Sequence, residues 1–433
     1  KIKIFETDED LKPLGDVFEF SHVKDIEINS SRKNFTDTAM VKMPKLVVIN
    51  QLNNSLGVEI ARRLPIDLKP RSIYEFFKED YYIEIFLGYD GDYKPAFRGY
   101  IKAVKGDAPV CIECEDYMYF LKKHKIVADA TPDVEEDPKN PLPNNPSERV
   151  DDPIEIIKNR LKELKAPFET NILNEKVDAL IINRNHNIVQ FLNMLKEDYD
   201  IHSYFKLEKD TSVLHITNNP NVYEAEDIEG FMDKYVIQTK KTPVPKAILN
   251  KALNVLGVND LLDFFKSDTF LGEAAFRFNY NIIQDNLKIK NENVKKIRVR
   301  AEKYFANSNT PIFVEAGDPN GELVKKYTLH EDTRMLSVDD AIALKKETEE
   351  IEASLSSFAS LRLAGLKQTG LTGSFTTFGE PFMRPTDRVF LENSEDEEKN
   401  GVFQVEEVQR SYGLGGYRQT ISLGRLVSKE ATQ

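Results

Sequence analysis

The segment from Tyr81 to Leu121 alternates apolar and polar side chains along three consecutive runs. Stretches rich in turn-forming residues separate the runs, GYDGD after the first and KGDAP after the second. A period of two places successive side chains on opposite faces of a strand. The pattern therefore predicts three antiparallel strands joined by short turns. One face of this predicted sheet is apolar and consists of Ile83, Ile85, Leu87, Phe97, Ile101, Ala103, Val110, Ile112 and Cys114.

The opposite face of the predicted sheet is not uniformly polar, because Phe86 and Tyr100 lie on it beside Arg98. Aromatic side chains in these positions indicate that this face is covered as well. A sheet that is exposed to water on neither side usually belongs to an assembly. We therefore expect Phe86, Arg98 and Tyr100 at a subunit interface.

A later alternating segment, VKKIRVRAEKYF, carries a basic stripe of Lys296, Arg298 and Arg300. Such a stripe can contact phosphates, or it can be a solvated or ion-paired face of a sheet. The net charge of −13 favours the second interpretation, since proteins that wrap nucleic acid have a basic surface. Arg298 and Arg300 are the two other candidates for interface residues.

Composition places few limits on the class of protein. The 433 residues are enough for about two to four domains, and no apolar run is long enough to predict a membrane span. The opening segment KIKIFETDED does not resemble a secretory signal, which favours synthesis in a reducing cytoplasm. The two cysteines, Cys111 and Cys114, point to opposite faces of one predicted strand, so a disulfide between them is disfavoured. We favour a core residue and a strand-face residue over a redox pair or half of a zinc site.

Changes in pattern along the chain predict five regions. Residues 1–127 are mainly β, and 128–152 form an acidic linker rich in Pro and Asn. Residues 153–220 form an α/β module, 221–273 are a helical insertion, and 285–433 return to β. The helical insertion is either a small satellite domain, which we favour, or a helix pair that binds a partner.

Helix signals are clearest in the module and near the end of the chain. Asp152 followed by Pro153 is typical of a helix start, and Asn187 is a suitable cap for a second helix. A strand is expected between the two helices, and a hairpin after the second. A long helix is predicted over 338–363, where an apolar stripe indicates packing along a sheet or another helix.

No catalytic, cofactor-binding or metal-binding motif emerges from the sequence. The six histidines are scattered without metal-ligand spacing, and neither a nucleophile elbow nor a Walker A loop is present. The glycines at 413, 415 and 416 are typical of a hairpin turn, because their spacing does not fit a phosphate loop and a strand follows them. We therefore expect that the chain is not an enzyme and needs no cofactor.

Four segments, in this order along the chain, resemble a known family. They are an opening hairpin that ends at Pro44, the segment 81–121, the segment NIVQFLNMLKEDYDIHSYFKLEKDTSVLHI, and the closing hairpin GVFQVEEVQRSYGLGGYRQTISLGRL. The second segment carries Gly88, Phe97, Gly99, Ile101, Glu115, Asp116 and Leu121. Together the four segments resemble phage tail baseplate hub proteins, the late control protein D family, which is related to the N-terminal part of type VI secretion spike proteins. The linker 128–152 and the segment 221–272 have no counterpart in this pattern.

The resemblance implies a fold of the α+β class that is mainly β. It would contain two tail-tube-like antiparallel β-barrels, an inserted α/β module and an additional helical segment. The first barrel, 1–127, would be completed by a strand near 274–284. The second barrel would be 285–433, with the helix 338–363 between its halves.

The resemblance also implies a function. The chain would be a structural baseplate hub of a phage tail or contractile injection particle, and its trimer would form a pseudo-sixfold ring between the tail tube and the central spike. The expected partners are two further copies of the chain, the tail tube protein, the spike protein and other baseplate components. We expect no specific binding of nucleic acid, no insertion into a membrane, and a location in the bacterial cytoplasm during assembly and then in the virion tail or injection particle. The alternative is a carbohydrate-binding or adhesive β-rich protein, against which the absence of Trp counts.

Overall fold

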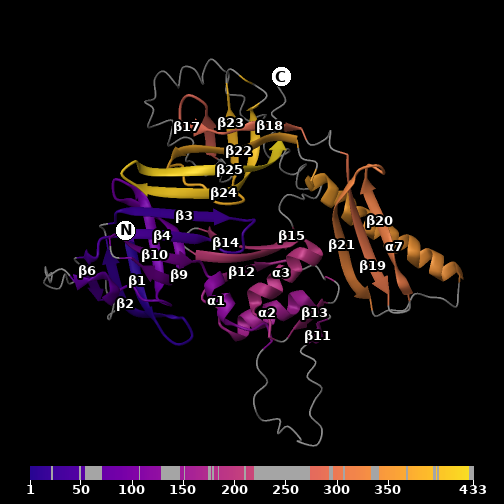
Figure 1. The fold of residues 1–433 in the computed structure, drawn as a ribbon, viewed down its shortest axis with the longest axis horizontal. Coiled ribbons are helices and arrows are strands. Elements are labelled where there is room, and N and C mark those ends of the chain that lie inside the picture. Colours follow the sequence, from indigo (N-terminus) through magenta and orange to yellow (C-terminus); the bar gives the residue numbers. More distant parts are fainter. Residues whose placement is uncertain are drawn as a thin grey trace, which may run out of the picture. The chain divides into compact units, whose positions relative to one another are not determined.

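The structure, a computed structural model, divides into two compact units (Figure 1). The first comprises Lys1–Asn219, Lys295–Leu363 and Gln409–Gln419, and the second Pro220–Val294, Ala364–Val408 and Thr420–Gln433. The helical insertion expected at 221–273 and most of the linker expected at 128–152 lie outside the described residues. The structure describes residues 1–20, 23–47, 50–53, 71–106, 108–127, 147–150, 152–173, 177, 180–183, 185–208, 211–218, 274–291, 296–305, 308–332, 341–366, 369–393, 396 and 399–428.

The first unit begins with an antiparallel sheet in which the strands follow the order β3-β4-β10-β9-β8-β1-β2-β6. A separate two-stranded ladder joins β5 to β7, and a short 3-10 helix, η1, follows β7. The bounds are Ile2–Thr7 for β1, Pro13–Phe20 for β2, Asp25–Ser31 for β3, Thr38–Met43 for β4, Leu46–Val47 for β5, Asn50–Asn53 for β6, Arg71–Ser72 for β7, Ile73–Glu75 for η1, Tyr82–Tyr89 for β8, Asp92–Lys105 for β9 and Val110–Glu115 for β10.

The predicted three-stranded meander is confirmed as β8, β9 and β10. Its apolar face is buried, with Ile83, Ile101 and Ile112 fully excluded from solvent. Asp90 and Gly91 connect β8 to β9 with φ values of 50° and 92°. Positive φ at both positions is typical of the two-residue turn whose twist matches that of the strands, which explains the GYDGD motif.

The mainly β class is confirmed, but the expected closed barrels are not. In the described part of the first sheet, β6 pairs with β2 alone and stands at one end of the order. Closing a barrel requires the two end strands to pair with each other at a defined stagger. Alternation along each strand predicts which side chains are buried, but it contains no information on whether the end strands meet.

An α/β module follows the first sheet, as predicted, and Figure 1 shows its helices side by side. Asp152 caps the first module helix by accepting a hydrogen bond from Glu155 N at 3.0 Å. Asn187 and Gln190 form a reciprocal capping box at the start of the second. The module contains α1 (Met118–Lys123), β11 (Ser147–Val150), α2 (Pro153–Glu163), β12 (Glu169–Ile172), β13 (Leu180–Asn183), α3 (Ile188–Tyr199), β14 (Ile201–Glu208) and β15 (Thr211–Asn218).

Two details of the module differ from the expectation. The end of the predicted linker is a strand, since β11 pairs with β13. Two strands, not one, lie between α2 and α3, and the first of them, β12, pairs in parallel with β15. Short strands of four residues carry too little alternation to be recognised without their pairing partners.

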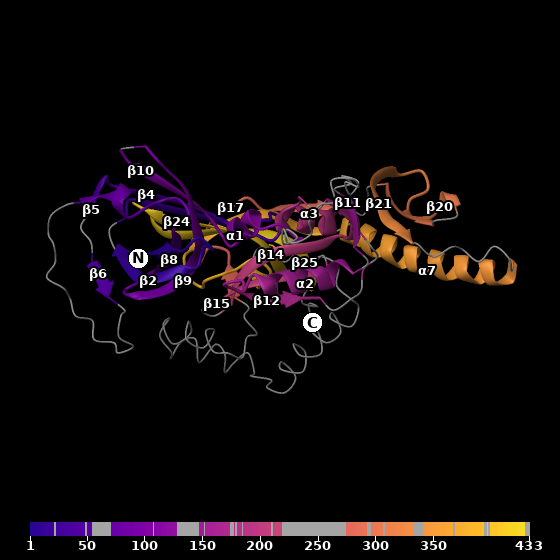
Figure 2. The same ribbon diagram turned by 90° about the horizontal axis from the view of Figure 1, so that it is seen from below.

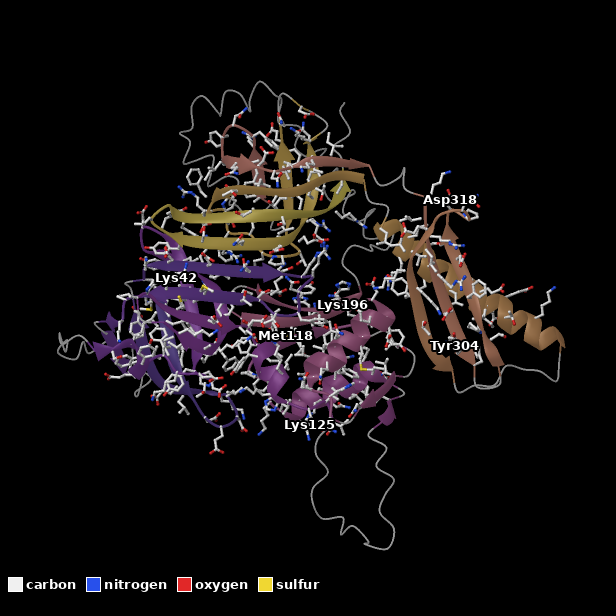
Figure 3. All side chains as sticks on the ribbon, in the orientation of Figure 1. Lys42, Met118, Lys125, Lys196, Tyr304 and Asp318 are labelled. Carbon is white, nitrogen blue, oxygen red and sulfur yellow. The ribbon has the colours of Figure 1, made fainter. Side chains whose placement is uncertain are left out.

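The module covers the outer face of the meander, so this cover comes from the same chain. Tyr82 pairs with Tyr100 across β8 and β9, and both rings lie within 5.8 Å of the ring of Tyr117. We call these three residues the tyrosine cluster. They share one apolar core with module residues such as Phe191 and with Met118, which is fully buried at the start of α1 (Figure 3).

The long helix is confirmed as α7 (Ala341–Leu366), which packs along a separate sheet of three strands (Figure 2). The strands are β19 (Ile297–Phe305), β20 (Ser308–Gly317) and β21 (Glu322–Asp332), in the order β20-β19-β21. Leu355 and Ala359 of α7 are buried against Ala301 of β19. We call β19–β21 and α7 the arm. Its strands were expected to belong to the second barrel, but they pair only with one another among the described strands.

The second unit contains an antiparallel core of β22 to β25 with shorter strands added. Phe276, Phe375, Val389 and Phe403 form its buried centre. The strand expected near 274–284 to complete the first barrel instead pairs within this unit, β16 with β23 and β17 with β22. The bounds are Ala274–Arg277 for β16, Ile282–Asp285 for β17, Lys288–Asn291 for β18, Thr369–Phe378 for β22, Arg388–Glu392 for β23, Gly401–Gly413 for β24 and Gly416–Ser428 for β25.

The capping box of α3 provides a test of the module. The substitution Asn187→Ala removes the acceptor for Gln190 N and lowers the stability of the module by about 1 kcal/mol. The matched control is Asn193→Ala, because Asn193 is exposed within the same helix and Ala is the better helix former there. Urea unfolding followed by circular dichroism measures both. Equal losses for the two variants would contradict the role of the cap.

Candidate interaction surface

The described residues offer no obvious reaction centre. Among them, no three His, Cys, Asp or Glu side chains gather closely enough to hold a metal ion. In the same part of the chain, no helix is both long and apolar enough to cross a membrane. Cys111 is half-buried and Cys114 is buried, both as free thiols, and burial raises the pKa of the Cys114 thiol.

Tyr100, one of the five predicted interface residues, has no exposed surface in this chain. Its hydroxyl donates to Leu11 O at 3.0 Å, and burial raises its pKa. Tyr117 donates to the Tyr82 hydroxyl at 2.8 Å, and burial raises the pKa of Tyr117 to about 12. The ring of Tyr100 is thus used inside the subunit, against the module, and is not presented to a partner.

Arg98 and Phe86 lie on the same sheet and are half-buried. Arg98 Nε lies 3.1 Å from Glu84 Oε1, and the two residues are direct partners across β8 and β9. The ring of Phe86 lies under the ammonium group of Lys3, 5.1 Å from its centroid. Both side chains keep some exposed surface, so their role at an interface stays a prediction.

Arg298 and Arg300 lie on another sheet, in the arm, so the structure does not bring the five predicted residues into one site. Arg298 Nη1 lies 2.8 Å from Glu315 Oε2, and Arg300 Nε lies 2.7 Å from Glu315 Oε1. The hydrogen bond from Arg300 and the charges of both guanidinium groups hold the pKa of Glu315 below its usual value. The basic stripe is therefore an ion-paired sheet face, as the acidic composition favoured. The guanidinium of Arg300 also covers the half-exposed ring of Phe313, 4.5 Å from its centroid.

Exposed apolar side chains gather instead at the ends of two hairpins of the first unit. One hairpin is β8–β9 and carries Tyr89, which is 38% exposed. The other is the end of β24–β25 and carries Tyr412 and Leu414, which are 40% and 105% exposed. The Tyr89 hydroxyl donates to Tyr417 O at 2.7 Å, and the two rings lie 5.6 Å apart. We call Tyr89, Tyr412 and Leu414 the hairpin-tip surface.

The hairpin-tip surface is held in place by its supports. The contact of Tyr89 with Tyr417 joins the two hairpin ends, and a Cβ atom at Gly413 would lie 2.6 Å from Asp25 Oδ1. Leu414 projects fully into solvent from the turn, and an exposed apolar side chain of this kind is suited to insertion into an apolar pocket of a partner. Sequence reasoning recognised only the turn and missed Leu414. A leucine within a glycine-rich turn violates the usual polar pattern of turns, and this was the available signal.

Several residues of the segment 81–121 that resemble the known family have structural roles and do not belong to the hairpin-tip surface. A Cβ atom at Gly99 would lie 2.1 Å from Glu115 O, so only glycine allows β9 and β10 to approach so closely at this point. Asp116 lies two residues before α1, and its carboxylate accepts a hydrogen bond from Met118 N, at the first residue of the helix, at 2.9 Å. Burial, and next the charge of Asp37, raise the pKa of Asp116 well above its usual value. Glu115 binds both Lys102 and Lys122 at 2.5 Å, which ties α1 to the meander.

No protein-family model matches the sequence, and no curated protein matches it either. The fold is similar to solved structures of phage tail proteins and of type VI secretion components. The tail protein from Neisseria meningitidis MC58 is 12% identical, with 94% of this chain and 93% of that chain covered and a TM-score of 0.48. The 43 kDa tail protein of prophage MuSo2 from Shewanella oneidensis is 9% identical, with 98% of each chain covered and a TM-score of 0.47. The E. coli c3393 protein is described as a component of the type VI secretion system with structural similarity to the T4 tail proteins gp27 and gp5. It is 9% identical, with 98% of this chain and 76% of that chain covered and a TM-score of 0.43.

These neighbours are of the same class that the sequence motifs resemble. At 12% identity or less and TM-scores below 0.5, these similarities identify no residue of a site.

The ion pairs of Glu115 predict a dependence of stability on pH. Burial alone would raise the pKa of Glu115, but hydrogen bonds from Lys102 and Lys122 outweigh burial and lower it. The stabilisation is therefore fully present above the ordinary Glu pKa of 4.5 and is lost as the pH falls through the lower folded-state pKa. The variant Glu115→Gln is expected to be less stable than the parent protein at pH 7, on the order of 1 kcal/mol, and this difference shrinks in acid.

Thermal unfolding between pH 3 and pH 7 measures this difference. Glu113→Gln is the matched control, because Glu113 lies on the same strand and pairs with the exposed Lys105 at 2.8 Å. A loss for Glu115→Gln that does not change with pH, or that the control reproduces, would exclude the role of the two ion pairs.

Proposed function

We propose that this chain is the structural hub of a phage tail or of a contractile injection particle. In this role it joins the tail tube to the central spike through its surfaces and catalyses no reaction. The observation that carries the proposal is the hairpin-tip surface, an exposed apolar projection from an antiparallel sheet whose own apolar faces are already buried. An exposed apolar side chain of this kind on a β framework is suited to contact with an apolar pocket of another protein.

The domain organisation supports the same role. The strands of each unit would supply one ring element, so that each chain supplies two and three chains supply six. The proposed homotrimer would match a sixfold tube on one side and a threefold spike on the other. In this proposal, 1–127 and the second unit contribute the ring elements, while the module and the arm lie outside the ring.

The charge of the chain supports transport through the ring without binding. A net charge of −13 repels the phosphates of nucleic acid, so a lumen of this sign would let nucleic acid pass. The proposed partners are the tail tube protein, the spike protein and other baseplate components. The proposed location is the bacterial cytoplasm during assembly and afterwards the tail of the particle.

The hub proposal predicts the mass of the assembly. Mixed with the tube and spike proteins of its own particle, the chain is expected to form a complex that contains three copies of 49.7 kDa each. Native mass spectrometry with and without each partner measures the stoichiometry, because trimers of a hub can depend on the spike. A chain that stays monomeric with both partners present would overturn the proposal.

The hairpin-tip surface predicts which substitution weakens assembly. Leu414→Asp is expected to weaken the complex by at least about tenfold, because a charge would replace an anchor that enters an apolar pocket. Leu14→Asp is the matched control, since Leu14 is also exposed but lies on β2, away from either hairpin end. Sedimentation of mixtures over a range of concentrations gives both affinities. Equal affinities for the two variants would remove the surface from the proposal.

A carbohydrate-binding or adhesive role is the second candidate, because exposed tyrosines at Tyr89, Tyr93 and Tyr412 can stack on sugar rings. Calorimetry with bacterial surface polysaccharides distinguishes the two roles. Binding that is lost in a Tyr93→Ala variant would favour the second candidate, since Tyr93 lies opposite Gly88 and outside the hairpin-tip surface.

A further inference from the structure

The arm and the α/β module have separate apolar cores. The core of the arm consists of Ala301, Leu355 and Ala359 together with half-buried side chains of β20 and α7. The core of the module is continuous with the tyrosine cluster and includes Phe191 and Leu195 of α3. Among the described residues, no side chain belongs to both cores. Each body therefore has its own apolar interior and does not depend on the other to bury it.

Buried charges lie at the junction between the two bodies, where α3 also packs against β21. Asp200 follows α3 directly, and its carboxylate lies 2.9 Å from Arg362 Nε of the arm and 3.0 Å from His202 Nε2 of the module. Arg362 Nη2 also donates to Tyr199 O, a carbonyl at the end of α3, at 3.1 Å. The side chains of Asp200 and Arg362 are only 9% and 7% exposed. We call this group the latch. In Figure 3, Lys196 marks the last turn of α3, from which the latch follows.

The geometry of the latch is specific. Asp200 adopts a left-handed conformation with φ of 56°, which Asp and Asn tolerate better than most residues and which ends the helix. The guanidinium lies beside a carboxylate and at the negative end of a helix, and both stabilise a buried cation by their charge. On its other side the guanidinium lies over the ring of Phe358, 4.5 Å from the centroid, and Phe358 contacts Tyr327 of β21.

A buried ion pair of this kind fixes the position of the arm against the module but adds little to the free energy of unfolding. Desolvation of two charges nearly cancels their attraction, whereas removal of one partner leaves an unpaired buried charge at a high cost in free energy. A second ion pair across the junction joins Lys325 to Glu197 at 3.9 Å and is exposed, so it contributes little. The placement of the arm therefore depends on Asp200 and Arg362.

We infer that the arm is a conformational element that the Asp200–Arg362 latch holds against the module and that can be released without unfolding either body. The chain then has two arrangements, latched and released, and the state of one buried ion pair selects between them. This inference does not depend on the role of the chain in a particle, because it concerns the junction alone.

A double-mutant cycle tests the latch. Asp200→Asn removes the charge but keeps the left-handed conformation and an oxygen acceptor for His202, and Arg362→Met removes the guanidinium at similar volume. Spin labels at the exposed Asn193 of α3 and Asn320 of the arm report the distance between the two bodies, with Cys111 replaced by Ser. The parent protein is expected to give one narrow distance distribution.

Each single variant is expected to give a broad distribution with longer distances, while α3 and α7 keep their protection from hydrogen exchange. The double variant Asp200→Asn/Arg362→Met is expected to give the same broad distribution as the single variants, because each of them already lacks the latch and the two effects do not add. Glu197→Gln, the control, leaves the distribution unchanged. Narrow distributions in both single variants, or loss of protection throughout α7, would overturn the inference: the first means that apolar packing holds the arm, and the second that the arm has no stability of its own.

Discussion

The first unit depends on the packing of the tyrosine cluster between the meander and the α/β module. Phenol rings bring much apolar area into a core, but each buried hydroxyl requires a partner. The cluster meets this requirement internally, since Tyr117 donates to Tyr82 and Tyr100 donates to a backbone carbonyl. One core therefore extends from the strands to the module helices. The module is thus an integral layer of the unit, and the meander without it would expose aromatic rings to water.

Local signals in the sequence predicted the local structure well. The alternation through Ile83 and Ile101 identified the meander, and Asp152 and Asn187 marked the true starts of two helices. The aromatic residues on the outer face correctly indicated that this face is covered. Each of these signals arises within a few residues, because strand alternation and helix capping are set by neighbouring side chains.

The rest depends on contacts between distant segments, about which one sequence says little. Alternation does not reveal which strand pairs with which, so β16 was expected to complete the first barrel although it pairs with β23, and closure of the barrels was wrongly expected. The cover over Tyr100 was assigned to a partner, although the module supplies it. The ion pair of Asp200 with Arg362 joins residues 162 positions apart, and neither belongs to a recognisable motif. The exposed Leu414 was missed because a turn pattern was sufficient to explain its glycines.

The last described hairpin has a consequence for how the chain is made. Its end, Gln409–Gln419, belongs to the first unit, while the rest of β24 and β25 belongs to the second. The ribosome therefore synthesises nearly all of the first unit long before the segment that supports Tyr89 emerges from the exit tunnel. Until then, the nascent first unit lacks the contact of Tyr89 with Tyr417. The first unit can therefore complete its fold only near the end of translation. A chain interrupted before residue 409 would lack a segment of each unit.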